Sequence, residues 1–160
     1  MTVEVPGLGP VAWEDEYDWH VSEPVTVAAL DDVTARIFLE GYDDDPAPDE
    51  VHAALRTFLT MDAAALHAAA VPVFEYYRET VELVGFDDPD EPMPVIADPD
   101  RVWEHVRIGD EVTVGRSPRD GRVYVSVECE CAWEAEHGLQ IVFRDGATVT
   151  KVGPYDGSMT

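Results

Sequence analysis

Basic residues are scarce in this chain of 160 residues. Ten Lys and Arg side chains stand against 34 Asp and Glu, which gives a formal net charge of −24, and Lys151 is the only lysine. A nucleic-acid backbone is bound through Lys and Arg, so this deficit excludes nucleic acid as a direct partner. The same surplus of negative charge suits a basic protein partner.

Cysteine and long hydrophobic runs are also nearly absent. The two cysteines, Cys129 and Cys131, are too few and too close together for the disulfide framework of a small secreted domain. No apolar run approaches the roughly 20 residues that cross a bilayer, and the first ten residues lack the basic and apolar regions of a signal peptide. We therefore expect a soluble cytoplasmic protein with no membrane contact.

The remaining composition is that of a folded domain. Hydrophobic residues make up 46% of the chain, and the 11 Gly and 12 Pro are too few for a low-complexity sequence. A chain of this length buries about two thirds of its unfolded surface, which suffices for a core without disulfides or metals. We expect one domain over residues 1–160.

The first 40 residues predict strands. Apolar residues alternate with polar ones over 24–30 and 33–39, and the Asp pair at 31–32 supplies a turn, so these segments predict a β-hairpin. Residues 11–13 predict a short additional strand. The acidic, aromatic segment 14–20 predicts a loop.

The middle of the chain predicts helices. Carboxylates and prolines over 43–50 favour a helix start, and a helix follows with Val51, Leu55, Phe58 and Leu59 on one stripe. A second helix is expected from Asp62 to Val84, with a kink or interruption at Pro72. The Pro- and Asp-rich segment 86–100 predicts an irregular connection, and Asp98-Pro99 predicts the start of a further short helix.

The last 50 residues predict four strands, joined by short turns at 117–121, 134–138 and 145–146. Short connections favour antiparallel neighbours, so a four-stranded meander is expected. Its strands are expected at 111–116, 122–133, 139–144 and 148–152. The order of strands, helices and strands predicts an α+β fold with helices on one face of an antiparallel sheet.

Two groups of residues invite a chemical interpretation. Cys129 and Cys131 alternate with valines on one face of their predicted strand, so we expect buried thiols and no metal. Glu134, Glu136 and His137 follow that strand and offer either acid–base chemistry or a structural turn that ends at Gly138. No nucleophile motif, phosphate loop or zinc-binding helix accompanies them, so the sequence assigns no catalytic residue and no cofactor.

Acidic runs and aromatic residues offer candidate contacts for a partner. The runs Asp43, Asp44, Asp45 and Asp87, Asp88, Asp90 lie in predicted exposed loops and lack the spacing of a calcium loop. Trp19 belongs to an aromatic group with Trp13 and Tyr17 in the predicted acidic loop, and Trp and Tyr are enriched at interface hot spots. These residues are the expected partner-binding positions.

The C-terminal third resembles a known type of family. The segments WEAEHGLQIVFRDG (133–146) and KVGPYDG (151–157) resemble an uncharacterised bacterial family of domains of unknown function, whose members share a Trp-Glu-x-Glu-His-Gly-Leu strand pair and a Gly-x-Tyr-Asp-Gly tail. The resemblance implies an α+β domain and a similarity to immunity-type proteins of polymorphic toxin systems. It implies no activity. Its recurrent residues here are Trp133, Glu134, Glu136, His137, Gly138, Tyr155, Asp156 and Gly157.

Three functions remain open. The first is a binding module, such as an immunity-like or inhibitor protein, that engages a basic partner, for example a toxin. The second is a metal-dependent or acid–base hydrolase, in which Glu134, Glu136, His137 and Asp156 would carry the chemistry. The third is a housekeeping domain whose charge serves solubility or salt adaptation. We favour the binding module, because excess charge has an immediate use in recognition; the oligomeric state stays open.

Overall fold

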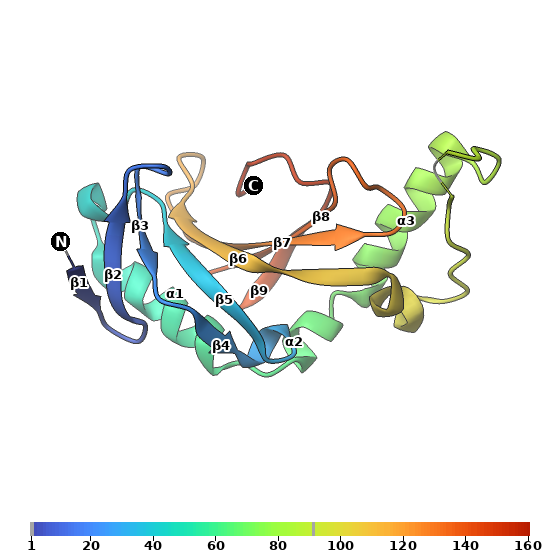
Figure 1. The fold of residues 1–160 in the computed structure, drawn as a ribbon. Coiled ribbons are helices and arrows are strands. Elements are labelled where there is room, and N and C mark those ends of the chain that lie inside the picture. The colour runs from blue at the N-terminus through green and yellow to red at the C-terminus, as the bar shows by residue number, and fades with distance from the viewer. Residues whose placement is uncertain (1, 91) are drawn as a thin grey trace.

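The computed structural model describes residues 2–90 and 92–160, and its strands join in a single twisted sheet (Figure 1). The strands are β1 (Thr2–Val5), β2 (Gly9–Glu14), β3 (Trp19–Ser22), β4 (Val25–Val27), β5 (Val33–Leu39), β6 (Val106–Arg116), β7 (Val123–Cys131), β8 (Leu139–Arg144) and β9 (Thr148–Gly153). The helices are α1 (Pro48–Thr60), α2 (Ala64–His67) and α3 (Ala70–Val84), with single 3-10 turns η1 (Ala28–Leu30) and η2 (Tyr42–Asp44) and a longer 3-10 helix η3 (Pro99–His105). The predicted α+β class is confirmed.

The strand order is β1-β2-β3-β5-β6-β7-β8-β9, and β4 pairs with β5 beside this path. The predicted meander of β6 to β9 is antiparallel throughout, although β6 begins at Val106 rather than at residue 111. Between β5 and β6 the pairing is parallel, with Arg36 opposite Glu111. This contact joins the N-terminal strands to the meander and makes one sheet of nine strands, which the sequence did not predict.

The N-terminal strands are more extensive than predicted. The hairpin of β4 and β5 is confirmed, with Val25 opposite Ala35. The predicted loop at 14–20 is shorter than expected, because β2 continues to Glu14 and β3 begins at Trp19, which leaves a tight turn over residues 15–18. Asp18 adopts a left-handed conformation with φ 58°, which lets this short turn reverse the chain.

The long helix predicted over 62–84 is divided into α2 and α3. Asp62 does not cap α3; its Oδ1 accepts a hydrogen bond from the backbone N of Ala64 at 2.9 Å, at the start of α2. Pro72 lies in the first turn of α3, where its missing N–H leaves no intrahelical bond unmade. The interruption is therefore at Ala68 and Ala69, before the proline.

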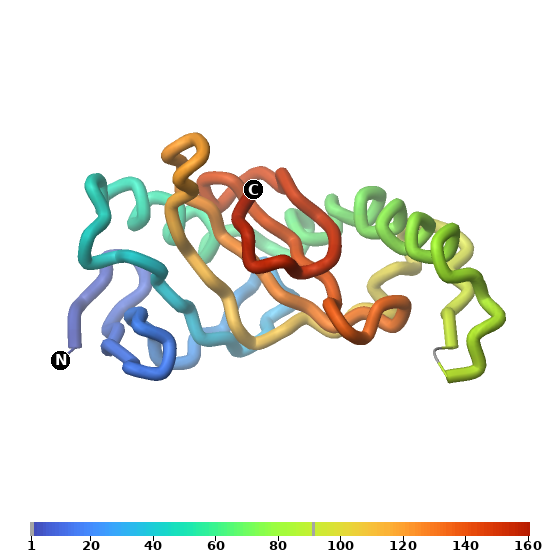
Figure 2. The backbone as a smooth tube through the Cα atoms, turned by 90° about the horizontal axis from the view of Figure 1, so that it is seen from above, coloured from blue at the N-terminus to red at the C-terminus, as the bar shows by residue number. Residues whose placement is uncertain are grey.

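Helices cover one face of the sheet, and the core lies between these layers. α1 packs on β6 and β7, and α3 packs near β9 and η3 (Figures 1 and 2). Phe58 of α1 meets Phe143 of β8 edge to face, with ring centroids 5.4 Å apart. Trp133 packs edge to face on Tyr76 and Tyr77 of α3, with ring centroids 5.7 Å apart in each pair.

The other face of the sheet is partly covered by the C-terminal tail, residues 154–160, which folds back over it (Figure 2). Gln140 donates from Nε2 to Oγ of Ser126 at 2.8 Å and to the backbone O of Ser158 at 3.0 Å. Ser126 is 5% exposed, and Tyr124 of the same strand is 4% exposed. Strict alternation, which predicts that every even-numbered residue of β7 is exposed, therefore fails in the first half of that strand and holds at Glu128 and Glu130.

None of the described helices is long and apolar enough to cross a membrane.

Candidate functional site

The segment Glu134–Gly138 forms a tight turn after β7. Oε2 of Glu134 accepts a hydrogen bond from the backbone N of His137 at 2.5 Å and lies 3.2 Å from Nδ1 of the same residue. The backbone O of Glu134 also accepts from the N of Gly138 at 3.1 Å. Polar atoms of Glu134, Glu136 and His137 lie within 4.8 Å of one another and could supply ligands to a cation, but the hydrogen bonds already give Glu134 a structural role.

The conformation and packing at position 138 require glycine. Its φ is +69°, and a Cβ at this position would lie 2.5 Å from the backbone O of Cys129. Its own carbonyl accepts a hydrogen bond from the hydroxyl of Tyr76 at 2.7 Å, which ties the turn to α3. The geometry therefore accounts for the glycine in the Glu-His-Gly segment by packing.

Asp156, the fourth residue of the hydrolase alternative, serves the C-terminal tail. Its Oδ1 accepts from Nζ of Lys151 at 2.6 Å and from the backbone N of Ser158 at 2.9 Å. The hydrogen bond from Lys151 lowers the pKa of this carboxyl group. The tail meets the turn through backbone, where the N of Tyr155 donates to the O of His137 at 3.3 Å. The four residues do not form one cluster of side chains.

Both cysteines are buried and free, as predicted. Burial raises the pKa of the Cys129 thiol to about 12 and that of Cys131 to about 11. Sγ of Cys131 lies 3.6 Å from the backbone O of Glu134, to which it donates. Protonated, buried thiols have neither the charge of a metal ligand nor that of a nucleophile.

The acidic run at 43–45 is only partly a solvated loop. Asp43 is exposed and lies 3.5 Å from Nδ1 of the buried His20, and Asp44 is exposed. The side chain of Asp45 is 5% exposed and accepts two hydrogen bonds from Arg116, at 2.9 and 3.0 Å. The expectation of an exposed loop is wrong for Asp45, because its partner comes from β6, 71 residues further along the chain.

The other acidic run is exposed, as predicted. Asp87, Asp88 and Asp90 follow α3 in the irregular segment 86–100, in which Glu91 lies outside the described residues. The backbone N of Asp90 donates to Oδ1 of Asp88 at 2.9 Å. The segment that carries these residues follows the end of α3 and lies away from the N-terminal strands (Figure 1).

The predicted aromatic group is divided by the pairing of β2 with β3. Trp19 lies opposite Glu14, whereas Trp13 lies opposite His20 on the other face of the pair. Trp19 is half-buried in a strand instead of exposed in a loop. Tyr17 remains in the turn and packs edge to face on Phe38 of β5, at 4.9 Å between ring centroids.

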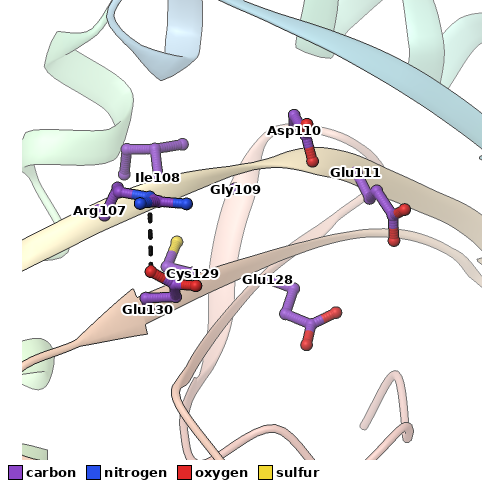
Figure 3. Close-up of a pocket in the computed structure, with 8 residues that line it drawn as sticks. All are labelled: Arg107, Ile108, Gly109, Asp110, Glu111, Glu128, Cys129 and Glu130. Carbon is purple, nitrogen blue, oxygen red and sulfur yellow. Dashed lines mark ion pairs between the residues drawn. The ribbon is translucent and has the colours of Figure 1, made fainter. Parts of the chain in front are cut away.

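A different group of charges gathers where β6 and β7 lose their regular register. The pairing shifts between Ile108 and Val112, and this bulge leaves a hollow of about 390 Å³ (Figure 3). A Cβ on Gly109 would lie 2.1 Å from the backbone O of Glu128, so the close approach of the strands requires glycine. The residues that line the hollow are Arg107, Ile108, Gly109, Asp110, Glu111, Glu128, Cys129 and Glu130.

Two carboxylates at this bulge share the outer face of the sheet. Glu111 and Glu128 point to the same side, whereas Asp110 points to the other (Figure 3). Partial desolvation of the carboxyl group, followed by the charge of Glu111, raises the pKa of Glu128, although the residue as a whole is exposed. Arg107 is occupied by Glu130 at 3.4 Å. Within residues 2–90 and 92–160, neither Glu111 nor Glu128 forms an ion pair of its own.

The nearest register partner of Glu111 does not neutralise it. Arg36 lies opposite Glu111 in the parallel pairing, but its guanidinium passes over the ring of Phe38, at 5.5 Å, and pairs with Glu14. The negative charge of Glu111 therefore stays uncompensated on the sheet.

The negative charge of Glu111 and Glu128 also raises the pKa of two tyrosines. Glu16, followed by burial and then Glu111, raises the pKa of Tyr17. Burial, followed by Glu128, raises the pKa of Tyr155 in the C-terminal tail. We call Tyr17, Glu111, Glu128 and Tyr155 the sheet-face patch.

Sequence reasoning missed the sheet-face patch. The available signal was Gly109-Asp110-Glu111, where a glycine and two adjacent acids interrupt an alternating strand and are typical of a bulge. The pairing of β6 with both β5 and β7 then decides which carboxylates share a face, and that information is not local.

The fold and this surface define an acidic α+β protein with one helix-covered sheet face and one charged face. A family model for a domain of unknown function, DUF6985, matches residues 8–159, which is nearly the whole chain. The chain belongs to this family. No curated protein and no solved structure matches it.

Proposed function

We propose that this protein is a binding module that receives a basic protein partner on the sheet-face patch. The observation that carries the proposal is the pair of carboxylates Glu111 and Glu128, which line one hollow and point to the same side of the sheet (Figure 3), with no ion pair of their own in the part of the chain that the structure describes. The module needs neither cofactor nor metal for this role.

Electrostatics favour a cation at this place. Burial and the neighbouring Glu111 disfavour the charged form of Glu128, so an approaching ammonium or guanidinium group relieves repulsion that the free protein carries. The overall charge of −24 adds a long-range attraction that speeds the encounter with a basic protein. Tyr17 and Tyr155 add rings whose faces attract cations.

Basic toxins are one class of partner that fits this chemistry. The resemblance to immunity-type proteins suggests an inhibitor that covers a basic active surface, such as that of a nuclease toxin. The electrostatic argument requires only a basic surface on the partner, so the toxin is the finer part of the proposal.

The hydrolase alternative has less support. The carboxylate of Glu134 accepts a hydrogen bond from the backbone of the turn, and that of Asp156 accepts one from the backbone of the C-terminal tail. Both contacts have a structural role. If the charge served only solubility or salt adaptation, the acidic residues would be spread over the surface without a preferred position. Glu111 and Glu128 instead line the same hollow at one bulge.

The test compares two charge-matched double variants in partner capture from the native host. Glu111→Gln with Glu128→Gln neutralises the sheet-face patch, and Asp87→Asn with Asp88→Asn removes the same charge at the end of α3. Captured proteins are identified at low and at physiological salt, and association rates are then measured with the purified partner.

We expect a basic partner whose association rate falls at least about tenfold from low to physiological salt, where the Debye length is about 8 Å. The patch variant should associate several-fold more slowly than wild type, and the 87/88 variant should match wild type. Equal behaviour of both variants, or capture of no basic protein, would overturn the proposal.

A further inference from the structure

The last strand of the sheet has a free edge beside a helix. β9 ends the strand order, and within the described parts of the chain no strand pairs with its outer side. A groove of about 280 Å³ lies between this edge and α3. The opposite wall consists of five consecutive residues of β9, 149–153, and of Pro154, which follows the strand, so the groove runs along the edge of the strand rather than over one face of the sheet.

The helix wall of the groove is acidic. Glu75 and Glu79 line it together with Pro72 and Tyr76, and both carboxylates are exposed. Neither of them forms an ion pair in the residues that the structure describes. Arg78, the basic residue of the same helix, does not line the groove.

The spacing of these carboxylates matches an extended peptide. Residues four apart on a helix are separated by a rise of about 6 Å. Alternate residues of a strand, which point to the same side, are about 6.6 Å apart. A strand added to β9 can therefore direct two basic side chains at Glu75 and Glu79 in register.

The lysine of β9 does not guard the edge. A charged side chain, often a lysine, protects many edge strands because it disfavours pairing with a further strand. Nζ of Lys151 instead contacts Oδ1 of Asp156 at 2.6 Å and the backbone O of Ser158 at 3.0 Å, so its charge is held by the tail. The register with β8 is regular from Lys151 to Gly153, after the irregularity next to Val149.

We propose that the groove between α3 and β9 binds an extended, basic segment of a partner protein as an added strand. Backbone hydrogen bonds to the edge of β9 supply affinity, and Glu75 and Glu79 select Lys or Arg at alternate positions. This site is separate from the sheet-face patch and does not depend on it.

The probe is a synthetic heptapeptide, acetylated and amidated, with the sequence Thr-Lys-Val-Lys-Val-Lys-Thr. Its affinity for the full-length protein is measured by calorimetry, and backbone amide exchange locates the bound peptide. We expect protection of residues 148–153 on binding. The same peptide with alternate backbone nitrogens methylated carries equal charge but cannot complete the ladder, so it should not bind.

Charge-matched variants separate the groove from the rest of the acidic surface. Glu75→Gln with Glu79→Gln should weaken binding about three- to tenfold, as expected for two exposed ion pairs. The control, Glu82→Gln with Asp87→Asn, removes the same charge outside the groove and should bind as wild type does, as should Glu111→Gln with Glu128→Gln. Equal binding of the methylated peptide, or protection outside 148–153 alone, would overturn the inference whatever the fate of the sheet-face patch.

Discussion

Asp45→Asn tests the buried contact that ties the segment before α1 to β6. Arg116 donates to both carboxylate oxygens of Asp45, at 2.9 and 3.0 Å, and also to Glu50 Oε2 and to the backbone O of Gly121, each at 2.6 Å. Hydrogen bonds to charged groups contribute about 1.5–3 kcal/mol each, and breaking a fully buried ion pair costs about 3–5 kcal/mol. The asparagine keeps one acceptor oxygen for Arg116, and Glu50 still pairs with the guanidinium. We therefore expect the free energy of unfolding to fall by about 2 kcal/mol.

For a chain of this size that loss lowers the melting temperature by about 4–8 °C, which thermal denaturation followed by circular dichroism measures directly. The matched control is Asp44→Asn, next in sequence and exposed, which should change stability by at most about 0.5 kcal/mol.

The pH dependence gives an independent check on the same pair. The hydrogen bond from Arg116 lowers the pKa of Asp45 in the folded state. A lowered pKa stabilises the folded protein above the unfolded value of about 3.9, and this stabilisation is lost as the pH falls through the folded value. The difference between wild type and Asp45→Asn should therefore be full at neutral pH and shrink below about pH 4. A difference that stays constant with pH, or an Asp45→Asn protein as stable as Asp44→Asn, would refute this reasoning.

Three further predictions concern the bulge and the strand β7. Glu128→Gln should stabilise the protein at neutral pH, because the raised pKa of Glu128 means that folding disfavours its charged form. The gain should vanish in acid, where the wild-type carboxyl group is protonated in both the folded and the unfolded state. Urea titrations at pH 7 and pH 3.5 measure the difference. Cys129 and Cys131 should react with a thiol reagent only after denaturation, and fast labelling of the native protein would contradict their burial. Gly109→Ala should destabilise by about 3 kcal/mol or prevent folding, because its Cβ would meet backbone at 2.1 Å, whereas Gly153→Ala meets nothing within 4 Å and should be tolerated in the same denaturation assay.

Local patterns predicted the elements whose partners are close in sequence. Asp145 and Gly146 both have positive φ, at 54° and 73°, as the Asp-Gly hairpin signal requires, and they join β8 to β9 as expected. The alternation over 33–39 likewise predicted β5. These signals are local because turn conformation and strand pleat are set by neighbouring residues.

Features that depend on distant pairings were missed. The burial of Asp45 depends on Arg116, and the burial of Ser126 depends on a tail that begins almost 30 residues later. The sheet-face patch requires the parallel pairing of β5 with β6 and the bulge opposite Glu128. The candidate residues at 43–45 and 87–90 were predicted from the density of acidic residues along the chain. The residues of the sheet-face patch are far apart in the sequence and become neighbours only through strand pairing.

The parallel pairing of β5 with β6 has a consequence for biosynthesis. Arg36 and Glu111 are neighbours in the sheet but 75 residues apart in the chain. At about 5–20 residues per second, a ribosome needs about 4–15 s to travel between them. Throughout that interval the nascent chain carries β5 with unpaired backbone N–H and C=O groups along the edge that β6 later occupies, and such an edge aggregates or recruits chaperones. The N-terminal half alone would keep this edge permanently, because β5 completes its pairing only after β6 has left the ribosome.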